Sequence, residues 1–356
     1  MTGSWWEYAA VFAASLALSF CLTPLMVKLA LKRDLLDHPS EHKAHTSPVP
    51  YLGGLAMVTA LSLAVLVAAL VRPPDDGASE LAAVLGMAVA LSIVGLVDDL
   101  RQRGLGPFVR LALEIAAAVG VWQVGAGVDL FGSGPADLAL TVFWVVGITN
   151  AFNLLDNMDG LSAGVAAIAG GSFFVIAAVN GQFLVAALSA ALTGCALGFL
   201  RHNFAPARIY MGDAGSLYLG FLLAYLGLKL RFDASDDVTF LVPILVLAVP
   251  IFDTVLVTAS RLLNRRSPLS GGRDHTSHRL VHVGLPVPAA VGTIYVAAVS
   301  LGVIALVVSR VDRTSAYVLA GLVLALGVLT LVVLGRVPVY EPTTPSPPRS
   351  AAKTLG

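Results

Sequence analysis

The sequence is poor in charged residues and in cysteine. Only 12% of its 356 residues are Asp, Glu, Lys or Arg, whereas 57% are hydrophobic. One soluble core of this size cannot bury so much apolar surface, so the composition excludes an ordinary soluble domain and predicts a protein that uses lipid as part of its solvent. The two cysteines, Cys21 and Cys195, lie far apart in apolar runs, which gives neither a disulfide framework nor a metal-ligand spacing.

The first apolar segment also lacks the marks of a removed signal peptide. No basic residue precedes it, and no obvious small-residue cleavage site is present. We therefore expect this segment to remain as a membrane anchor. The 22 basic and 22 acidic residues cancel, so the total charge does not indicate an anionic partner.

Long apolar runs, separated by Pro, Gly, Asn and charged residues, predict an all-α polytopic membrane protein. A helix needs about 20 apolar residues to cross the hydrocarbon, and only helices or closed barrels satisfy every backbone group there. Runs of this length exclude a barrel. We expect eleven spans, at residues 6–29, 52–71, 80–97, 108–126, 138–155, 161–179, 183–200, 214–229, 238–262, 289–309 and 316–335.

The basic residues predict the orientation of these spans. Seventeen of the 22 Lys and Arg residues fall on one side and five on the other. By the positive-inside rule the rich side is cytoplasmic, so the N-terminus is expected outside and the C-terminus inside. We expect a single transmembrane domain at 1–335, followed by a disordered, dispensable tail at 336–356. The loops expected to form the site are 30–51, 98–107, 201–213 and 263–288.

Residues capable of chemistry gather at span ends on this cytoplasmic side. Asp98 and Asp99 end the third span, and adjacent carboxylates repel each other unless a cation or a shared proton relieves them. This pattern favours a magnesium ion or a positively charged neighbour. The alternative is an ordinary interfacial pair at a helix end.

Residues 150–160 carry the most specific pattern. Asn150, Asn153, Asp156 and Asp159 recur at every third position, so each neighbours the next on a helix or a tighter terminal turn. The spacing predicts a polar edge at the membrane boundary. Helix capping would explain one or two of these residues but not all four.

Two further segments predict contacts to phosphate. Residues 212–216 form a Gly-rich turn before an apolar helix, where free N–H groups attract phosphate and Asp213 can hold a metal ion. Residues 265–279 combine phosphate donors with His275 and His278. We favour phosphate contact over zinc there, because no third ligand has the usual spacing.

Three residues have less specific surroundings. Asp253 lies inside the ninth span, where an ionised carboxylate should face a cavity or a partner, although a helix-packing hydrogen bond is the alternative. Lys43 and His45 lie in a second basic loop, where they can reach a nucleotide or merely orient the second span.

The motifs taken together resemble the polyprenyl-phosphate N-acetylhexosamine-1-phosphate transferases over residues 30 to 285. Four motifs stand in the family order. They are Lys-x-His with Pro-x-x-Gly-Gly (Lys43, His45, Pro50, Gly53, Gly54), Asp-Asp (Asp98, Asp99), Asn-Ala-Phe-Asn-Leu-Leu-Asp-x-x-Asp-Gly-Leu (150–161) and Met-Gly-Asp-x-Gly-Ser (211–216).

The resemblance implies transfer of a sugar 1-phosphate from a UDP-sugar to a polyprenyl phosphate lipid, with release of UMP. It implies Mg²⁺ as the cofactor, for which Mn²⁺ can substitute, and a bacterial inner membrane with the active site facing the cytoplasm. We expect no nucleic acid partner, and a homodimer is compatible with the family. The span count and the cytoplasmic C-terminus favour the branch that uses UDP-N-acetylglucosamine and undecaprenyl phosphate.

The resemblance also implies roles for individual residues. Asp213, supported by Asp99, holds the metal, and Asp98 deprotonates or positions the lipid phosphate. The remaining residues are implied in catalysis or in contacts to nucleotide and phosphate, and they are Asp156, Asp159, His275, His278, Lys43, His45, Asn150, Asn153, Asn203, Tyr210, Arg273 and Arg279.

Two departures and three alternatives accompany this interpretation. Ser277 stands where the family's histidine loop has another imidazole, and Asp99 is followed by Leu100 without the usual acidic or lysine residue downstream. The alternatives are a muramoyl-pentapeptide phosphotransferase, a secondary transporter with an intramembrane carboxylate pathway, and a noncatalytic nucleotide-sugar binder. A transporter often shows an internal repeat and midplane ionisable residues. No repeat is visible, and the polar residues gather on one side.

Overall fold

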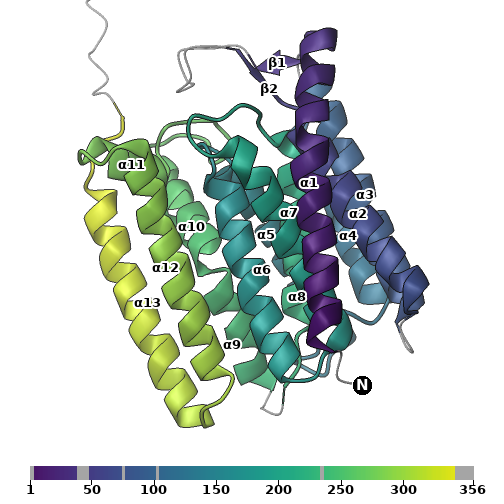
Figure 1. The fold of residues 1–356 in the computed structure, drawn as a ribbon. Coiled ribbons are helices and arrows are strands. Elements are labelled where there is room, and N and C mark those ends of the chain that lie inside the picture. Colours follow the sequence, from purple (N-terminus) through teal and green to yellow (C-terminus); the bar gives the residue numbers. More distant parts are fainter. Residues whose placement is uncertain (1–3, 38–47, 74–76, 102–103, 233–235, 341–356) are drawn as a thin grey trace, which may run out of the picture.

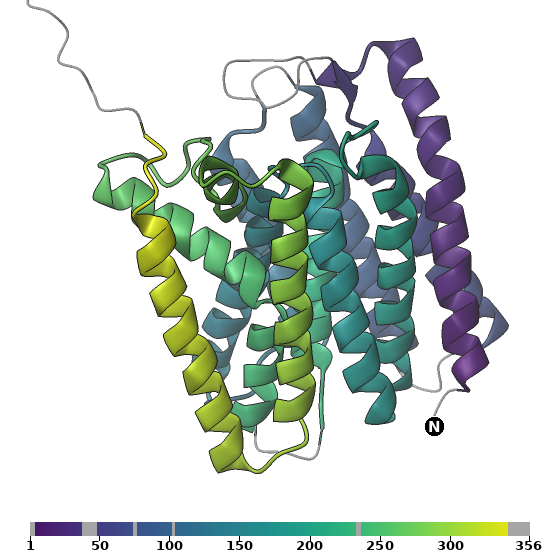
Figure 2. The same ribbon diagram turned by 60° about the vertical axis from the view of Figure 1, so that its left-hand side comes forward.

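A computed structural model describes residues 4–37, 48–73, 77–101, 104–232 and 236–340. These parts of the chain form a bundle of helices with one short two-stranded hairpin, as Figures 1 and 2 show from two sides. The all-α membrane architecture expected from the sequence is confirmed. Thirteen helices are described, with the bounds α1 Trp5–Arg33, α2 Gly53–Val71, α3 Ala78–Leu100, α4 Pro107–Gln123, α5 Gly134–Leu155, α6 Leu161–Val179, α7 Phe183–Asn203, α8 Gly212–Lys229, α9 Asp236–Val246, α10 Ala248–Leu263, α11 Thr276–His282, α12 Val287–Val308 and α13 Arg313–Gly335.

Every predicted span has a helical counterpart, but the ninth is broken. Residues 238–262 were expected as one helix, whereas α9 and α10 meet at an angle of 72°. Pro243 lies inside α9 and Pro250 lies in the first turn of α10, and both remove backbone donors next to the break at Leu247. Among the described residues, eight helices are long and apolar enough to cross a membrane, or nine if the bent pair is one span. The count of eleven stays a prediction.

Helix α8 forms the centre of the bundle. Its residues from Ala214 to Leu228 are all buried, as expected for a helix that is apolar on every side. It packs against α3, α5 and α2. The first turn of α8 carries Asp213, so the core holds this carboxylate at one end of the bundle.

Glycine allows α3 and α8 to approach closely. A Cβ atom on Gly95 of α3 would collide with the backbone of Asp213 and Ala214. This approach places the acidic end of α3 beside the start of α8.

One end of the bundle carries the loops expected to form the site. Strands β1 (Leu36–Asp37) and β2 (Val49–Pro50) pair antiparallel there, and α11 lies at the same end, opposite the N-terminus (Figure 1). The short hairpin was not expected from the sequence.

The beginning of the expected tail is bonded to this end. The Tyr340 hydroxyl donates to Oδ2 of Asp274 over 2.5 Å, and the Val337 carbonyl accepts from Arg279 over 3.1 Å. Residues 336–340 therefore belong to the folded domain, which corrects the boundary predicted at 336. Residues 341–356 lie outside the described part of the chain.

Candidate active site

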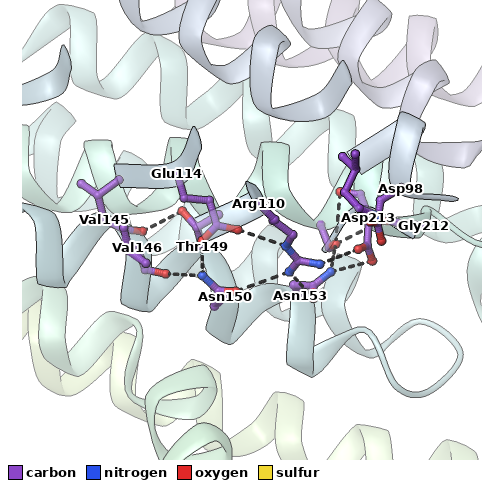
Figure 3. Close-up of polar contacts among 12 residues, drawn as sticks. Asp98, Arg110, Glu114, Val145, Val146, Thr149, Asn150, Asn153, Gly212 and Asp213 are labelled. Carbon is purple, nitrogen blue, oxygen red and sulfur yellow. Dashed lines mark hydrogen bonds and ion pairs between the residues drawn. The ribbon is translucent and has the colours of Figure 1, made fainter. Parts of the chain in front are cut away.

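The Asp-Asp pair meets the Gly-rich turn at the start of α8. Both carboxylate oxygens of Asp99 accept backbone N–H groups, from Asp213 over 3.1 Å and from Ala214 over 3.2 Å. Gly212 has a φ of +65°, and a Cβ atom there would collide with the Asp99 carboxylate. The turn thus needs glycine twice over, for its backbone conformation and for the approach of Asp99. Asp98 lies beside Asp213, as Figure 3 shows.

Arg110 of α4 lies at the centre of the polar cluster. Its Nη1 donates to Oδ2 of Asp213 over 2.6 Å, and its Nη2 donates to Oδ1 of Asn153 over 2.6 Å (Figure 3). Its Nε donates to Oε1 of Glu114 over 3.1 Å, one helical turn further along α4. A single guanidinium therefore links α4, α5 and α8.

Sequence reasoning missed both Arg110 and Glu114. Arg110 was counted only as a basic residue that indicates topology. The available sequence signal was the pair itself, because Glu114 lies in an apolar segment and stands four residues after an arginine. In the structure Glu114 is only 1% exposed. Such an intramembrane ion pair usually marks a functional site.

The amides of α5 share this cluster. Nδ2 of Asn153 donates to Oδ1 of Asp213 over 2.8 Å and to the Ser216 hydroxyl over 3.0 Å. Asn150 donates to Glu114 and to the Val146 carbonyl. The three-residue spacing thus brings both amides to the same place, as the sequence predicted.

The two carboxylates that follow α5 lie in the loop after it. Asp156 caps the helix, and burial, followed by the charges of Asp213, Asp99 and Asp159, raises its pKa to about 8. Asp159 accepts the backbone N–H of Ala207 over 2.8 Å. Burial and the charges of Asp159, Asp37 and Asp156 also raise the pKa of Tyr210. These carboxylates therefore face one region of negative potential, with Tyr210 beside it.

Asp253, for which the sequence indicated no specific partner, holds the histidine loop (residues 265–279). Oδ2 of Asp253 lies 2.8 Å from Nδ1 of His275, and Oδ1 accepts the backbone N–H of Thr276 over 2.7 Å. A neutral imidazole that donates to this carboxylate carries its proton on Nδ1 and has Nε2 as an acceptor. Asp253 thus orients His275 and caps α11.

His278 and Ser277 follow on the same short helix. The Ser277 hydroxyl donates to Oδ1 of Asn157 over 2.6 Å, which docks α11 against the loop that carries Asp156. Burial, followed by the neighbouring charges of His275 and Arg273, lowers the pKa of His278 to about 4. His278 is therefore neutral near pH 7, and the serine that departs from the family pattern has a structural contact of its own.

Three expected substrate contacts lie elsewhere or have other partners. Arg279 is fully buried, and its guanidinium donates to the carbonyls of Asp274, Leu334 and Val337 and to the Ser260 hydroxyl. Asn203 is buried as well, and it accepts from the Gly160 N–H and donates to the Ile209 carbonyl. Arg273 is exposed. Both Arg279 and Asn203 thus fix the loops around the site, which differs from the substrate contact expected for them.

Lys43 and His45 lie in residues 38–47, outside the described part of the chain. The flanking strands β1 and β2 place the ends of this loop close to the site, since the Tyr210 N–H donates to the Pro50 carbonyl over 2.8 Å. The Tyr210 carbonyl in turn accepts the Gly53 N–H over 2.9 Å. Their expected contact with a nucleotide stays a prediction.

The donor set suits a hard divalent cation. Asp98, Asp99, Asp156 and Asp213 offer carboxylate oxygens, which are the ligands that Mg²⁺ prefers. Among the described residues, no three His, Cys, Asp or Glu side chains already stand in metal-binding geometry. The oxygens of Asp213 are engaged by Arg110 and Asn153 instead. The chemistry of the residues therefore fits Mg²⁺, with Arg110 and Asn153 bound to the same carboxylate of Asp213.

Comparisons with known proteins agree with this geometry. Residues 81–231 match the family described as glycosyl transferase family 4. A probable undecaprenyl-phosphate N-acetylglucosaminyl 1-phosphate transferase of Bacillus subtilis is 33% identical over 293 residues, which cover 80% of each chain. The chain belongs to glycosyl transferase family 4.

Two further relatives are similar to the chain over different shares of its length. A decaprenyl-phosphate N-acetylglucosaminephosphotransferase of Mycobacterium tuberculosis is 31% identical over 93% of this chain and 90% of its own length. A phospho-N-acetylmuramoyl-pentapeptide-transferase of Bacillus mycoides is 32% identical over 62% of this chain and 73% of its own length. The residues matched to the glycosyl transferase family 4 pattern include Asp98, Asp99, Glu114, Asp156, Asp159 and Asp213, whereas the histidine loop lies beyond them.

Proposed function

We propose that this membrane enzyme transfers N-acetylglucosamine 1-phosphate from UDP-N-acetylglucosamine to a polyprenyl phosphate, with release of UMP. The observation that carries the proposal is the convergence of Asp98, Asp99, Asn153 and Asp213 at one end of the helical bundle. The names of the Bacillus and Mycobacterium relatives support the sugar and the lipid. We infer that the reaction uses Mg²⁺ and takes place on the cytoplasmic face of the bacterial inner membrane.

The reaction brings two anionic groups together. An oxygen of the lipid phosphate attacks the β-phosphorus of the UDP-sugar, the new P–O bond forms, and the bond from that phosphorus to the oxygen bridging to the α-phosphorus breaks. UMP leaves with the bridging oxygen, so the product is a polyprenyl diphosphate sugar. Catalysis of such a transfer consists mainly of positioning and charge neutralisation.

The carboxylates of α3 and α8 would hold the cation. Asp213 and Asp99 are the residues placed to bind Mg²⁺, which when bound neutralises phosphate charge and polarises the P–O bond. Asp98, next to Asp213, is placed to orient the lipid phosphate or to accept its proton. Arg110 donates to Asp213 and Asn153, so it would supply a second positive charge near the phosphates.

The remaining polar residues would position the substrates. Asp156, Asp159 and Tyr210 lie around the expected nucleotide edge. His275 presents Nε2 because Asp253 engages Nδ1, so its imidazole can accept a proton or a hydrogen bond from a phosphate. His278 is neutral near pH 7 and contributes a hydrogen bond rather than a full charge.

A direct assay tests the proposal. Purified protein with Mg²⁺, polyprenyl phosphate and labelled UDP-N-acetylglucosamine should release UMP and form a labelled lipid. The variant Asp213→Asn should lose at least about 100-fold in rate, the effect typical of removing one electrostatic contact to a transition state. Full activity of Asp213→Asn at limiting Mg²⁺ would show that Asp213 does not bind the metal.

The main competing substrate is a UDP-linked muramoyl pentapeptide, suggested by the Bacillus mycoides relative. Mass spectrometry of the lipid formed from a panel of UDP-sugars separates the two, because the products differ by a peptide. A lipid product that carries the pentapeptide would overturn the proposed sugar. UDP-sugar binding without any UMP release would instead indicate a noncatalytic binder.

A further inference from the structure

A polar cavity lies at the end of α7, apart from the side chains of the candidate active site. Its volume is about 510 Å³, and none of the residues assigned above to metal, phosphate or nucleotide lines it. The last turns of α7 and the loop that leads to α8 form its walls. The residues that matter here are Leu197, Leu200, Arg201, His202, Phe204 and Arg208.

The cavity is lined by cationic side chains and by no carboxylate. Arg201 and Arg208 come from α7 and from the following loop, which folds back so that the Arg208 N–H donates to the His202 carbonyl over 2.9 Å. Neither guanidinium has a hydrogen-bond or ion-pair partner in the part of the chain that the structure describes. Guanidinium groups bind phosphate through paired, charge-assisted hydrogen bonds, so this cavity is suited to a phosphate anion.

The same cavity has an apolar edge. Leu197 is 40% exposed and Phe204 is 42% exposed, and both line the cavity next to the arginines. Because α7 is long and apolar enough to cross a membrane, its final turns stand at the boundary between hydrocarbon and water. A ligand that fills this site would therefore combine an anionic head with an apolar chain.

We propose that this cavity binds the headgroup phosphate of an anionic phospholipid of the surrounding membrane. Arg201 and Arg208 contact the phosphate, and the first part of an acyl chain packs against Leu197 and Phe204. A topology signal alone requires basic residues on one side of the membrane, but it does not require two of them to converge on one cavity from separate segments.

The position of the cavity links it to the candidate active site. The loop that contributes Phe204 and Arg208 also carries Ala207, whose N–H binds the carboxylate of Asp159 over 2.8 Å. A lipid bound against this loop would restrain the segment that holds Asp159. The site is thus placed to make the order of this loop depend on the lipid.

Native mass spectrometry of the full chain in detergent tests the proposal, with dioleoyl phosphatidylglycerol and dioleoyl phosphatidylcholine as the probes. We expect the first phosphatidylglycerol to bind more tightly than phosphatidylcholine. The double variant Arg201→Gln/Arg208→Gln should bind that lipid at least about tenfold more weakly. Each basic residue near an anionic surface contributes roughly a fivefold gain in affinity, so the loss of two exceeds tenfold. The control Lys28→Gln/Lys32→Gln removes two charges from α1 that do not line the cavity, and it should bind phosphatidylglycerol as the wild type does.

Unchanged binding by the arginine double variant would overturn the proposal. Displacement of phosphatidylglycerol by excess inorganic phosphate would overturn it too, because the site would then be one for free phosphate. A second measurement needs only the wild-type chain, in case the double variant does not fold. Hydrogen exchange of residues 197–208 should be slower in phosphatidylglycerol nanodiscs than in phosphatidylcholine nanodiscs, and equal exchange in the two would contradict the proposal.

Discussion

Nη1 of Arg110 lies 2.6 Å from Oδ2 of Asp213, so a guanidinium stands beside the carboxylate assigned to the metal. Asp98, Asp99, Asp156 and Asp213 otherwise bring carboxyl groups together, and the proximity of Asp213 and Asp99 adds to burial in raising the pKa of Asp156. Arg110 is therefore the built-in counter-ion of the cluster, and a divalent cation bound at Asp213, as we propose, would compete with it. Glu114, which also binds Arg110, is placed to retain the guanidinium when it leaves Asp213.

Removal of this counter-ion should strengthen cation binding and weaken catalysis. We expect Arg110→Gln to bind Mn²⁺ about tenfold more tightly, the equivalent of about 1.4 kcal/mol, because a competing positive charge is gone. The rate should fall because Asn153 and Asp213 lose a common donor. Electron paramagnetic resonance titration of Mn²⁺ measures the affinity, with Arg101→Gln at the exposed end of α3 as the control. Equal affinity in wild type and Arg110→Gln would show that the two cations do not compete.

The α3–α8 contact should be sensitive to one methyl group. Gly95→Ala places a Cβ atom against the backbone of Asp213, so the two helices must separate and Asp99 must lose its contacts to the start of α8. We expect a loss of activity of at least about tenfold, together with lower thermal stability from overpacking of about 1–3 kcal/mol. Gly86→Ala on the same helix is the matched control, since nothing lies within 4 Å of its Cβ. Wild-type activity in Gly95→Ala would refute the close approach.

His278 should make folding depend on pH. Its pKa is lowered to about 4 in the folded protein, so the unfolded chain takes up the proton first, below its own pKa of about 6.5. Stability is therefore complete above about pH 6.5 and is lost as the pH falls toward 4. The penalty reaches about 2 kcal/mol at pH 5. Thermal unfolding of His278→Gln should thus depend less on pH between about 7 and 5 than that of wild type, and parallel curves would contradict the assignment.

The C-terminal segment should divide sharply into a needed part and a dispensable part. Truncation after Tyr340 should leave thermal stability and activity unchanged. Truncation after Arg336 removes the hydroxyl that binds Asp274 and the Val337 carbonyl that binds Arg279, and should cost about 1–3 kcal/mol. Tyr340→Phe tests the hydroxyl alone. Equal melting temperatures for the two truncations would show that residues 337–340 do not hold the histidine loop.

Asp274 explains why that segment matters. Burial alone would raise its pKa, but hydrogen bonds from Arg261 and Tyr340 outweigh burial and lower it. Arg261 donates from Nε and Nη2 to the two oxygens of Asp274, each over 2.8 Å. Asp274 directly precedes His275 in the chain. The anchor of the histidine loop is thus an ion pair completed by the C-terminal segment.

Much of the fold and of the site could be predicted from local patterns. Apolar runs gave the helices because the length needed to cross a bilayer is fixed, and the third-residue spacing placed Asn150 and Asn153 on one face of α5. The break between α9 and α10 was less predictable, because an apolar run of that length reads as one span until packing decides what Pro243 does. The contacts of Arg279 with the Leu334 and Val337 carbonyls were not predictable, since these two acceptors lie more than fifty residues away, at and just beyond the end of α13.

The partner of Asp253 could not be predicted from the sequence either. Its position within an apolar run indicated a partner, but periodicity could not say which. The partner is a histidine 22 residues later, in a loop whose sequence indicated contact with phosphate or zinc but not with Asp253. Residues that come together only through the tertiary fold leave no repeating pattern in the sequence. Arg110 on α4 and Asp213 on α8 are another such pair.

The order of synthesis gives the Asp253–His275 contact a further meaning. Asp253 is synthesised with α10, 22 residues before the histidine that contacts its carboxylate. An unpartnered carboxylate in this setting costs on the order of 3 kcal/mol. The contacts with residues 275 and 276 therefore offset a cost that α10 would carry alone, so the stability of α10 in the membrane depends on a segment that follows it in the chain.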